Sequence, residues 1–497
     1  MWRNTLAVLL LLWCTGLHSQ QVLTLEDAMT IAIKNSPEMI KSELSMTISK
    51  ENLNAQEAAT KSLIRFQLTP FFYDQTRSFY SQFSSWSTVE TKRIYGDFIV
   101  SQPIKLTDGR ITLQNQLVYQ EASSDFNNTS SKGYSNNLFL KFSQPVFTYN
   151  KLKMELNQLR LSLENATLSY AIQRLFLERL VNQYFYTVYQ RKMSLAVAED
   201  EYKNQQTGYE IIKSKVEAGL SAREELLQAE LNLATSESNL QNAQMNLANA
   251  KDDFMQYIGM PLSEEFEIET NIEFTEVPVD ENKAIESGLT TRMELRQREI
   301  DIQNSQDQLT VAKSVNEFDG TVDLSLGLFG ENPSFADIYN KPTRSPQVMV
   351  SFNIPIWDWG ERKSRIKAAE AAIRIQEINL DVEKTKVELD IRQTCRSLQN
   401  LILQIEIARQ NEKNAQLTYE INLERYKNGD LNSMDLGRYQ NQLSEKKMNL
   451  SNSLINYKLE LINLKIQSLW DFERNASFVP EEYQKNISSE NLPSSVK

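Results

Sequence analysis

The stretch VEAGLSAREELLQAE, residues 216–230, recurs in outline 210 residues later as YKNGDLNSMDLGRYQ, residues 426–440. In each stretch a glycine, Gly219 or Gly429, precedes a segment whose large apolar residues repeat every seven positions. These residues are Leu226, Leu233, Leu240, Leu247 and Phe254 in the first copy, and Leu436, Leu443, Leu450, Tyr457 and Leu464 in the second. Landmarks at one constant offset indicate an internal duplication, which governs every other inference about the fold.

N-terminal to each of these stretches, each copy has a strand-like segment that contains a proline. The two segments are NLFLKFSQPVF with Pro145 and SFNIPIWDWG with Pro355. Residues 151–206 and 361–428 then contain neither Gly nor Pro, which predicts unbroken helices of about 60 residues and roughly 90 Å. Second helices are expected over about 222–257 and 432–470. The repeated unit is therefore a strand followed by a long antiparallel helical hairpin.

A period of seven over several repeats is typical of a coiled-coil seam. In the first copy a small residue follows each large one three positions later; these are Ala229, Ser236, Ala243 and Ala250. Of the equivalent positions in the second copy, only Ser453 is small. An ordinary coiled coil without a channel accounts for this periodicity equally well.

Apolar and polar residues alternate in segments of about ten residues that precede the long helices. The apolar sets are Ile111, Leu113, Leu117 and Tyr119; Leu138, Leu140 and Phe142; Val322, Leu324, Leu326 and Leu328; and Val348, Val350, Phe352, Ile354 and Ile356. Such segments fit a transmembrane β-barrel, and they fit a soluble β-sandwich equally well.

Two further alternating segments, Ile64–Tyr73 and Arg93–Ile104, have no counterpart in the second copy. They form an insertion of about forty residues, and the turn Lys105–Gly109 that follows is a hairpin signal. In a barrel, the inserted strands either widen the barrel or lie outside it, and the sequence leaves both options open.

The sequence also excludes several classes of protein. Residues 1–19 have the layout of a secretory signal peptide, with a lipoprotein signal ending at Cys14 as a minor alternative. Removing them removes the only histidine and leaves Cys395 as the only cysteine, which excludes histidine-based catalysis and His- or Cys-cluster metal sites. A net charge of −12 argues against a nucleic-acid partner. No cofactor is expected, and the protein is not expected to be an enzyme.

The expected organisation is a signal peptide (1–19), a first repeat (20–259, with inserted strands at about 64–104), an acidic linker (260–281), a second repeat (282–470) and a polar C-terminal tail (471–497).

At this point the chain resembles the TolC family of outer membrane efflux proteins. The motifs responsible are LTLEDAMTIAIKNSPE at the start, SQPVF and NIPIW between strand and helix, and the two glycine-containing stretches quoted above. The resemblance implies a mixed α and β fold and a homotrimer in the outer membrane of a Gram-negative bacterium. Each subunit would give about four strands to a twelve-stranded transmembrane β-barrel, with more if the insertion contributes, and two hairpins to a periplasmic α-barrel.

The resemblance also implies the functional residues. Gly219, Leu220 and Ser221, with Gly429 and Leu431, would form two helix-turn-helix tips that dock a periplasmic adaptor. Glu225, Asp435 and Tyr426 would occupy the periplasmic constriction. As alternatives, the glycines are ordinary helix C-caps and the carboxylates stabilise helix N-termini.

Two positions depart from the family pattern. Leu431 stands where a basic gate residue is expected, and Arg438 stands at the second acidic position. We therefore hypothesise that Arg438 pairs with an acidic group across the constriction.

The expected function is the passive exit duct of a tripartite efflux or type I secretion system. Its partners would be outer membrane lipid, a periplasmic adaptor and an inner-membrane pump of the RND, ABC or MFS type. The alternative is a periplasmic coiled-coil adaptor or structural protein without a channel.

Overall fold

Four long helices repeat at the 210-residue offset. Helices α4 (Lys151–Glu217) and α8 (Glu361–Lys427) each have 67 residues, and helices α5 (Arg223–Ile258) and α9 (Ser433–Ser468) each have 36. The shorter helices α2 (Leu25–Asn35) and α3 (Pro37–Ala59) correspond to α6 (Glu281–Thr291) and α7 (Met293–Ser314), with α2 and α6 beginning 256 residues apart. The 46 residues by which these offsets differ reflect the extra strands of the first copy.

The computed structural model describes residues 21–125, 129–268, 274–428 and 430–479. The expected signal peptide, and the tail beyond residue 479, lie outside these residues. The described residues form two compact units, one within 46–166 and 297–380 and the other within 21–45, 167–296 and 381–479. Among the described residues, none of the helices combines the length and the apolar composition that a membrane crossing requires.

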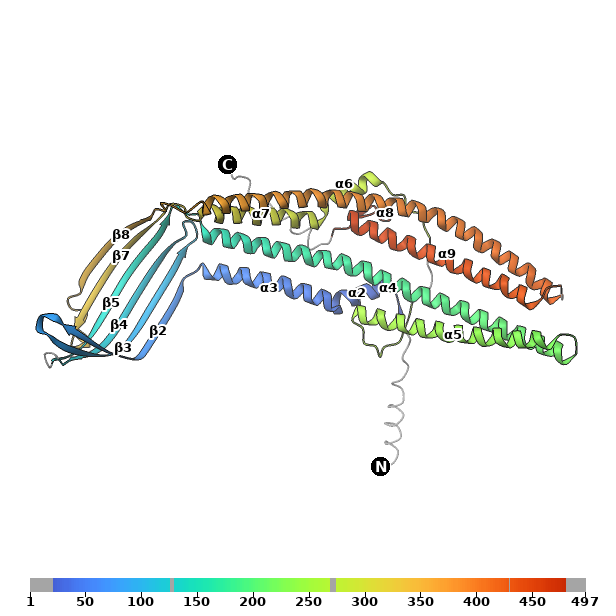
Figure 1. Cartoon of the computed structure of the whole chain (residues 1–497), viewed down its shortest axis with the longest axis horizontal. Coiled ribbons are helices and arrows are strands. Elements are labelled where there is room, and N and C mark those ends of the chain that lie inside the picture. The colour runs from blue at the N-terminus through green and yellow to red at the C-terminus, as the bar shows by residue number, and fades with distance from the viewer. Residues whose placement is uncertain (1–20, 126–128, 269–273, 429, 480–497) are drawn as a thin grey trace, which may run out of the picture. The chain divides into compact units, whose positions relative to one another are not determined.

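The unit made of residues 46–166 and 297–380 contains an antiparallel sheet of six strands (Figure 1). The strands are β2 (Leu63–Tyr80), β3 (Ser85–Ile104), β4 (Gly109–Ser124), β5 (Thr129–Val146), β7 (Asp319–Asn332) and β8 (Thr343–Asn353), and they pair in this order. The inserted hairpin is β2 and β3, and within one chain it extends the sheet at one edge.

Strand register places the apolar sets on one face of this sheet. Phe98 of β3 lies opposite Phe66 of β2, and Leu113 of β4 lies opposite Val100 and Leu140. A neighbouring row on the same face runs from Phe142 of β5 across Leu324 of β7 to Val348 of β8. The other face is polar: Lys141 pairs with Asp323 at 3.3 Å, and Gln114 Nε2 donates to Asp97 Oδ1 at 2.8 Å. The predicted division into an apolar and a polar face is confirmed.

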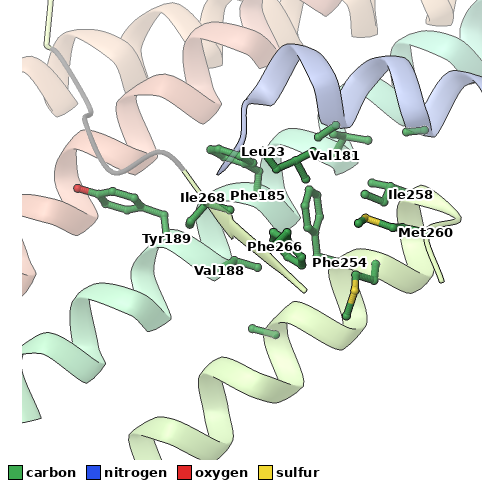
Figure 2. Packing of buried hydrophobic residues seen from close by; sticks show 14 of the residues in the cluster. Leu23, Val181, Phe185, Val188, Tyr189, Phe254, Ile258, Met260, Phe266 and Ile268 are labelled. Carbon is green, nitrogen blue, oxygen red and sulfur yellow. The ribbon is translucent and has the colours of Figure 1, made fainter. Parts of the chain in front are cut away.

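The core of the other unit forms where two short strands cross helices α4 and α5 (Figure 2). Strand β1 (Gln21–Leu23) pairs in parallel with β6 (Phe266–Ile268). Leu23, Phe266 and Ile268 are buried there against Val181, Phe185, Phe254 and Ile258. The segment expected to be an acidic linker is thus partly built into the core, because its Phe266 and Ile268 alternate with an outward Glu267.

The expected polar tail also begins inside the fold. Strands β9 (Trp470–Asp471) and β10 (Ala476–Ser477) pair with each other, and Asp471 and Val479 are buried. Lys465 holds Asp471 at 3.0 Å.

The predicted seam positions of the second helices are buried in part, and the large residues Leu226, Leu233, Leu240, Leu247, Leu436 and Leu450 are half-buried. The fully buried seam residues are Ala229, Ser236, Ala250 and Phe254 on α5, and Leu443, Tyr457 and Leu464 on α9. Helix α4 also contacts α9, where Gln190 Nε2 donates to Asn452 Oδ1 at 2.7 Å. A second apolar series lies exposed along α8 and includes Ile375, Ile378, Val382, Leu389, Leu403 and Ile407.

Candidate functional site: the paired helical tips

The turn between α4 and α5 is closed by backbone hydrogen bonds around Gly219. Leu220 N donates to the Lys215 carbonyl at 2.8 Å, and Gly219 N donates to the Val216 carbonyl at 3.0 Å. This is a Schellman motif, whose penultimate residue adopts a left-handed conformation. Gly219 has a φ of +70°, and a Cβ added to it would meet nothing within 4 Å. The turn thus requires glycine for its backbone conformation and not for space, as the helix C-cap alternative stated.

The turn between α8 and α9 has an equivalent closure. Asp430 N donates to the Arg425 carbonyl at 2.9 Å, with the same sequence spacing and at the 210-residue offset. The predicted tip residue Gly429 lies outside the described residues. The duplication therefore extends to the hydrogen bonds that end the two long helices.

The two second helices begin with different caps. Asn432 Oδ1 accepts from Asp435 N at 2.8 Å, and Asn432 Nδ2 donates to Asp435 Oδ2 at 2.9 Å. At the start of α5 the N-cap residue is Ala222, which offers no side-chain acceptor. There Ser221 Oγ donates to Glu225 Oε2 instead. Both predicted constriction carboxylates therefore sit in the first turn of a helix, where the N-terminal dipole favours negative charge.

The tips share a groove of about 660 Å³. It brings together five of the predicted site residues, Leu220, Ser221 and Glu225 from the first tip and Tyr426 and Leu431 from the second. Its other lining residues include Lys215, Glu224, Asp430, Asn432 and Met434, none of which the sequence analysis singled out. Among these, Asn432 could have been found from the sequence, because Asn432 and Asp435 have the N-x-x-D spacing of a helix N-cap.

Tyr426 is a half-buried residue of the groove. Its hydroxyl is buried and has no hydrogen-bond partner among the described residues. Burial raises the pKa of Tyr426 above its usual value. An unpaired buried hydroxyl is costly, so this group is a candidate donor to a partner outside the described residues.

Three of the predicted residues that the structure describes, Gly219, Asp435 and Arg438, do not line the groove. Asp435 is half-buried, and its carboxylate accepts a hydrogen bond from the side chain of the N-cap residue Asn432. Arg438 is exposed on α9 and forms no ion pair within the described part of the chain. The hypothesis that Arg438 pairs with an acidic group across a constriction therefore needs a partner from another chain.

Each tip exposes a large apolar side chain to solvent. Leu220 is 80% exposed and Met434 is 64% exposed. Next to them lie the carboxylates Glu224, Glu225 and Asp430. A surface with apolar anchors and an acidic rim is suited to binding another protein.

Comparisons with known proteins support a common architecture. The family model described as "Outer membrane efflux protein" matches residues 111–260 and 284–466. Among curated proteins, no relative matches. The crystal structure of the Campylobacter jejuni CmeC outer membrane channel is similar with a TM-score of 0.69 and 14% identity over 93% of this chain and 88% of that one.

Two further solved structures are similar to this chain. The outer membrane protein VceC of Vibrio cholerae has a TM-score of 0.65 and 13% identity, covering 91% of this chain and 96% of that one. The open state of the Neisseria gonorrhoeae MtrE outer membrane channel has a TM-score of 0.63 and 12% identity, with 91% and 90% covered.

Proposed function

The chain belongs to the outer membrane efflux protein family, and from this premise we propose that it is a passive exit duct whose paired helical tips dock a periplasmic adaptor. An outer membrane efflux channel of a Gram-negative bacterium is a conduit and not an enzyme. The family implies a trimer within a tripartite efflux system. The adaptor would connect the duct to an inner-membrane pump of the RND, ABC or MFS type, and a type I secretion system would use the same arrangement.

The observation that carries the docking proposal is the exposure of Leu220 and Met434 beside the acidic groove. Large apolar side chains at the ends of helices are costly to leave in water, and fully burying one contributes about 1.5–3 kcal/mol. The alternative of a periplasmic coiled-coil adaptor gives no role to a six-stranded sheet with one continuous apolar face.

The proposed trimer gives the exposed stripe along α8 a partner. Its members, among them Val382, Leu389 and Leu403, follow a heptad spacing, and in the described part of the chain each is at least half exposed. Packing against a neighbouring copy would bury this stripe.

The proposed constriction is tested by removing charge without removing the caps. In Asp435→Asn and Glu225→Gln an amide oxygen still accepts the hydrogen bonds from Asn432 and Ser221. If the carboxylates line the narrowest part of the duct, each variant lowers the preference for cations, because rings of carboxylates select cations. The measurement is the reversal potential of single channels in a planar bilayer under a KCl gradient.

Glu230→Gln is the matched control, since Glu230 is an exposed carboxylate of α5 that does not line the groove. It should leave the reversal potential unchanged. Channels that respond to none of the three substitutions would keep the duct and move the constriction to other residues.

A further inference from the structure

The outer strands of the six-stranded sheet have unpaired edges in a single chain. Within the described residues β2 pairs only with β3, and β8 pairs only with β7. Every residue of β8 and nearly every residue of β2 is exposed. Unpaired backbone groups are not tolerated facing lipid, so both edges of a sheet in a membrane must be paired.

The apolar face continues to both edges. On β2 it consists of Ile64, Phe66 and Leu68, which lie opposite Val100, Phe98 and Gly96 of β3. On β8 it consists of Val348, Val350 and Phe352, which lie opposite Leu324, Val322 and Gly320 of β7. A hairpin that was not part of the lipid-facing sheet would not need apolar side chains that continue the apolar face of that sheet. The inserted strand β2 is therefore built as part of that face.

Prolines limit where the two edges can pair. Pro70 lies in β2 where the register with β3 shifts between Thr69 and Phe72, and Pro346 lies in β8. Proline has no N–H to donate to a neighbouring strand. The proline-free windows that adjoin the helices, Leu63–Thr69 and Gln347–Asn353, both have seven residues, and β2 has a further proline-free segment over Phe71–Tyr80. Each window lies at the strand end that adjoins a helix, β2 following α3 and β8 preceding α8.

We propose that β2 of one copy pairs antiparallel with β8 of the next, so that a trimer closes a ring of eighteen strands, six from each chain. Aligning the two windows end to end places Ile64 opposite Phe352, Phe66 opposite Val350 and Leu68 opposite Val348 of the next copy. This register keeps all six side chains on the apolar face. The inference rests on the proposed trimer and replaces the expected twelve strands.

An eighteen-stranded ring is about half as wide again as a twelve-stranded one, because diameter grows roughly linearly with strand number. The inserted hairpin thus sets the width of the outer part of the duct. Cargo of larger cross-section would pass this part than a twelve-stranded ring admits.

Disulfide cross-linking between copies tests the pairing in the full-length protein. Directly opposed residues of antiparallel strands have Cα atoms about 4.5–5.5 Å apart, within the range that a disulfide spans. Phe66→Cys with Val350→Cys should therefore give covalent dimers and trimers on oxidation in membranes. Cys395 does not interfere, because it is 3% exposed and burial raises its pKa to about 11.

Three comparisons make the result decisive. Gln67→Cys with Val350→Cys puts the thiols on opposite faces and should not cross-link. Cross-linking of Leu113→Cys with Val350→Cys, and not of Phe66→Cys with Val350→Cys, would overturn the proposal, because β4 would then form the edge of a twelve-stranded ring. The mass of the native protein distinguishes failure of the pairing from failure of the proposed function. A trimer without the β2–β8 cross-link refutes the pairing, whereas a monomer refutes the proposed trimeric duct itself.

Discussion

At the scale of single residues, the first turn of each second helix depends on what stands at its N-cap. Asn432 caps α9 through its side chain, whereas Ala222 leaves α5 without such a cap. Ala222 already has the extended backbone of an N-cap, with φ −76° and ψ 146°. An N-cap side chain contributes about 1 kcal/mol.

We therefore expect Ala222→Asn to slow amide hydrogen exchange at Glu224 and Glu225 roughly fivefold, which corresponds to about 1 kcal/mol. Asn432→Ala should accelerate exchange at Asp435 by a similar factor. Hydrogen-exchange mass spectrometry of the purified protein measures both. Ala222→Leu is the control, because leucine has no acceptor; equal protection by Leu and Asn would contradict the capping explanation.

The residues of the tips were predictable only in part. The 210-residue offset identifies Glu225 and Asp435 as equivalent, and both occupy the same helix position in the structure. That Tyr426 shares a groove with Leu220 depends on the packing of one hairpin beside the other. This packing uses contacts such as Gln190 to Asn452, 262 residues apart, which no local pattern reveals.

At the scale of elements, strand β6 is attached to the long helices by charge as well as by burial. Glu267 accepts from Lys192 Nζ at 2.7 Å and from Lys251 Nζ at 3.2 Å. These lysines hold the pKa of Glu267 below its usual value near 4.5. A lowered pKa stabilises the folded state above the unfolded pKa, and the contribution is lost as the pH falls through the lowered value.

The β1–β6 pair should consequently become easier to open below about pH 4.5, the ordinary pKa of this carboxyl. In Glu267→Gln the β1–β6 pair should open more easily already at neutral pH, and the ease of opening should no longer depend on pH in this range. The measurement is amide exchange of residues 21–23 between pH 7 and pH 3, corrected for intrinsic rates. Glu265→Gln, an exposed neighbour, is the control; the same loss of pH dependence in that variant would sink the idea.

The elements that sequence patterns missed are the short or evenly polar ones. Strands β1 and β6 have three residues each, too few for a periodicity to be recognised. The segments predicted at 64–73 and 93–104 extend to Tyr80 and begin at Ser85, respectively. Residues between them, such as Asp74, Glu90 and Lys92, are polar on both faces and show no alternation. By contrast, the heptad series and the absence of Gly and Pro located all four long helices.

At the scale of the whole molecule, the two copies of the duplication contribute unequal numbers of strands to the sheet. The first copy contributes β2 to β5 and the second contributes only β7 and β8, while their helical hairpins remain equal in length. The helical end of the duplication is thus kept regular, and the strand end carries the difference. Docking at the tips and the width of the sheet are therefore separable properties, which substitutions at one should not disturb at the other.

Leu220→Glu tests this separation at the docking end. Leu220 is 80% exposed, so a charge there leaves the isolated fold intact but opposes burial against an adaptor. Losing the contribution of one buried leucine, about 1.5–3 kcal/mol, weakens docking at least tenfold. We expect a corresponding fall in the yield of cross-linked channel–adaptor complex from the native host, with unchanged conductance of the purified channel. Leu262→Glu, exposed and remote from the groove, should leave both unchanged. If Leu220→Glu lowers conductance as well, or if both variants lose the complex equally, the tips are not a separate docking surface.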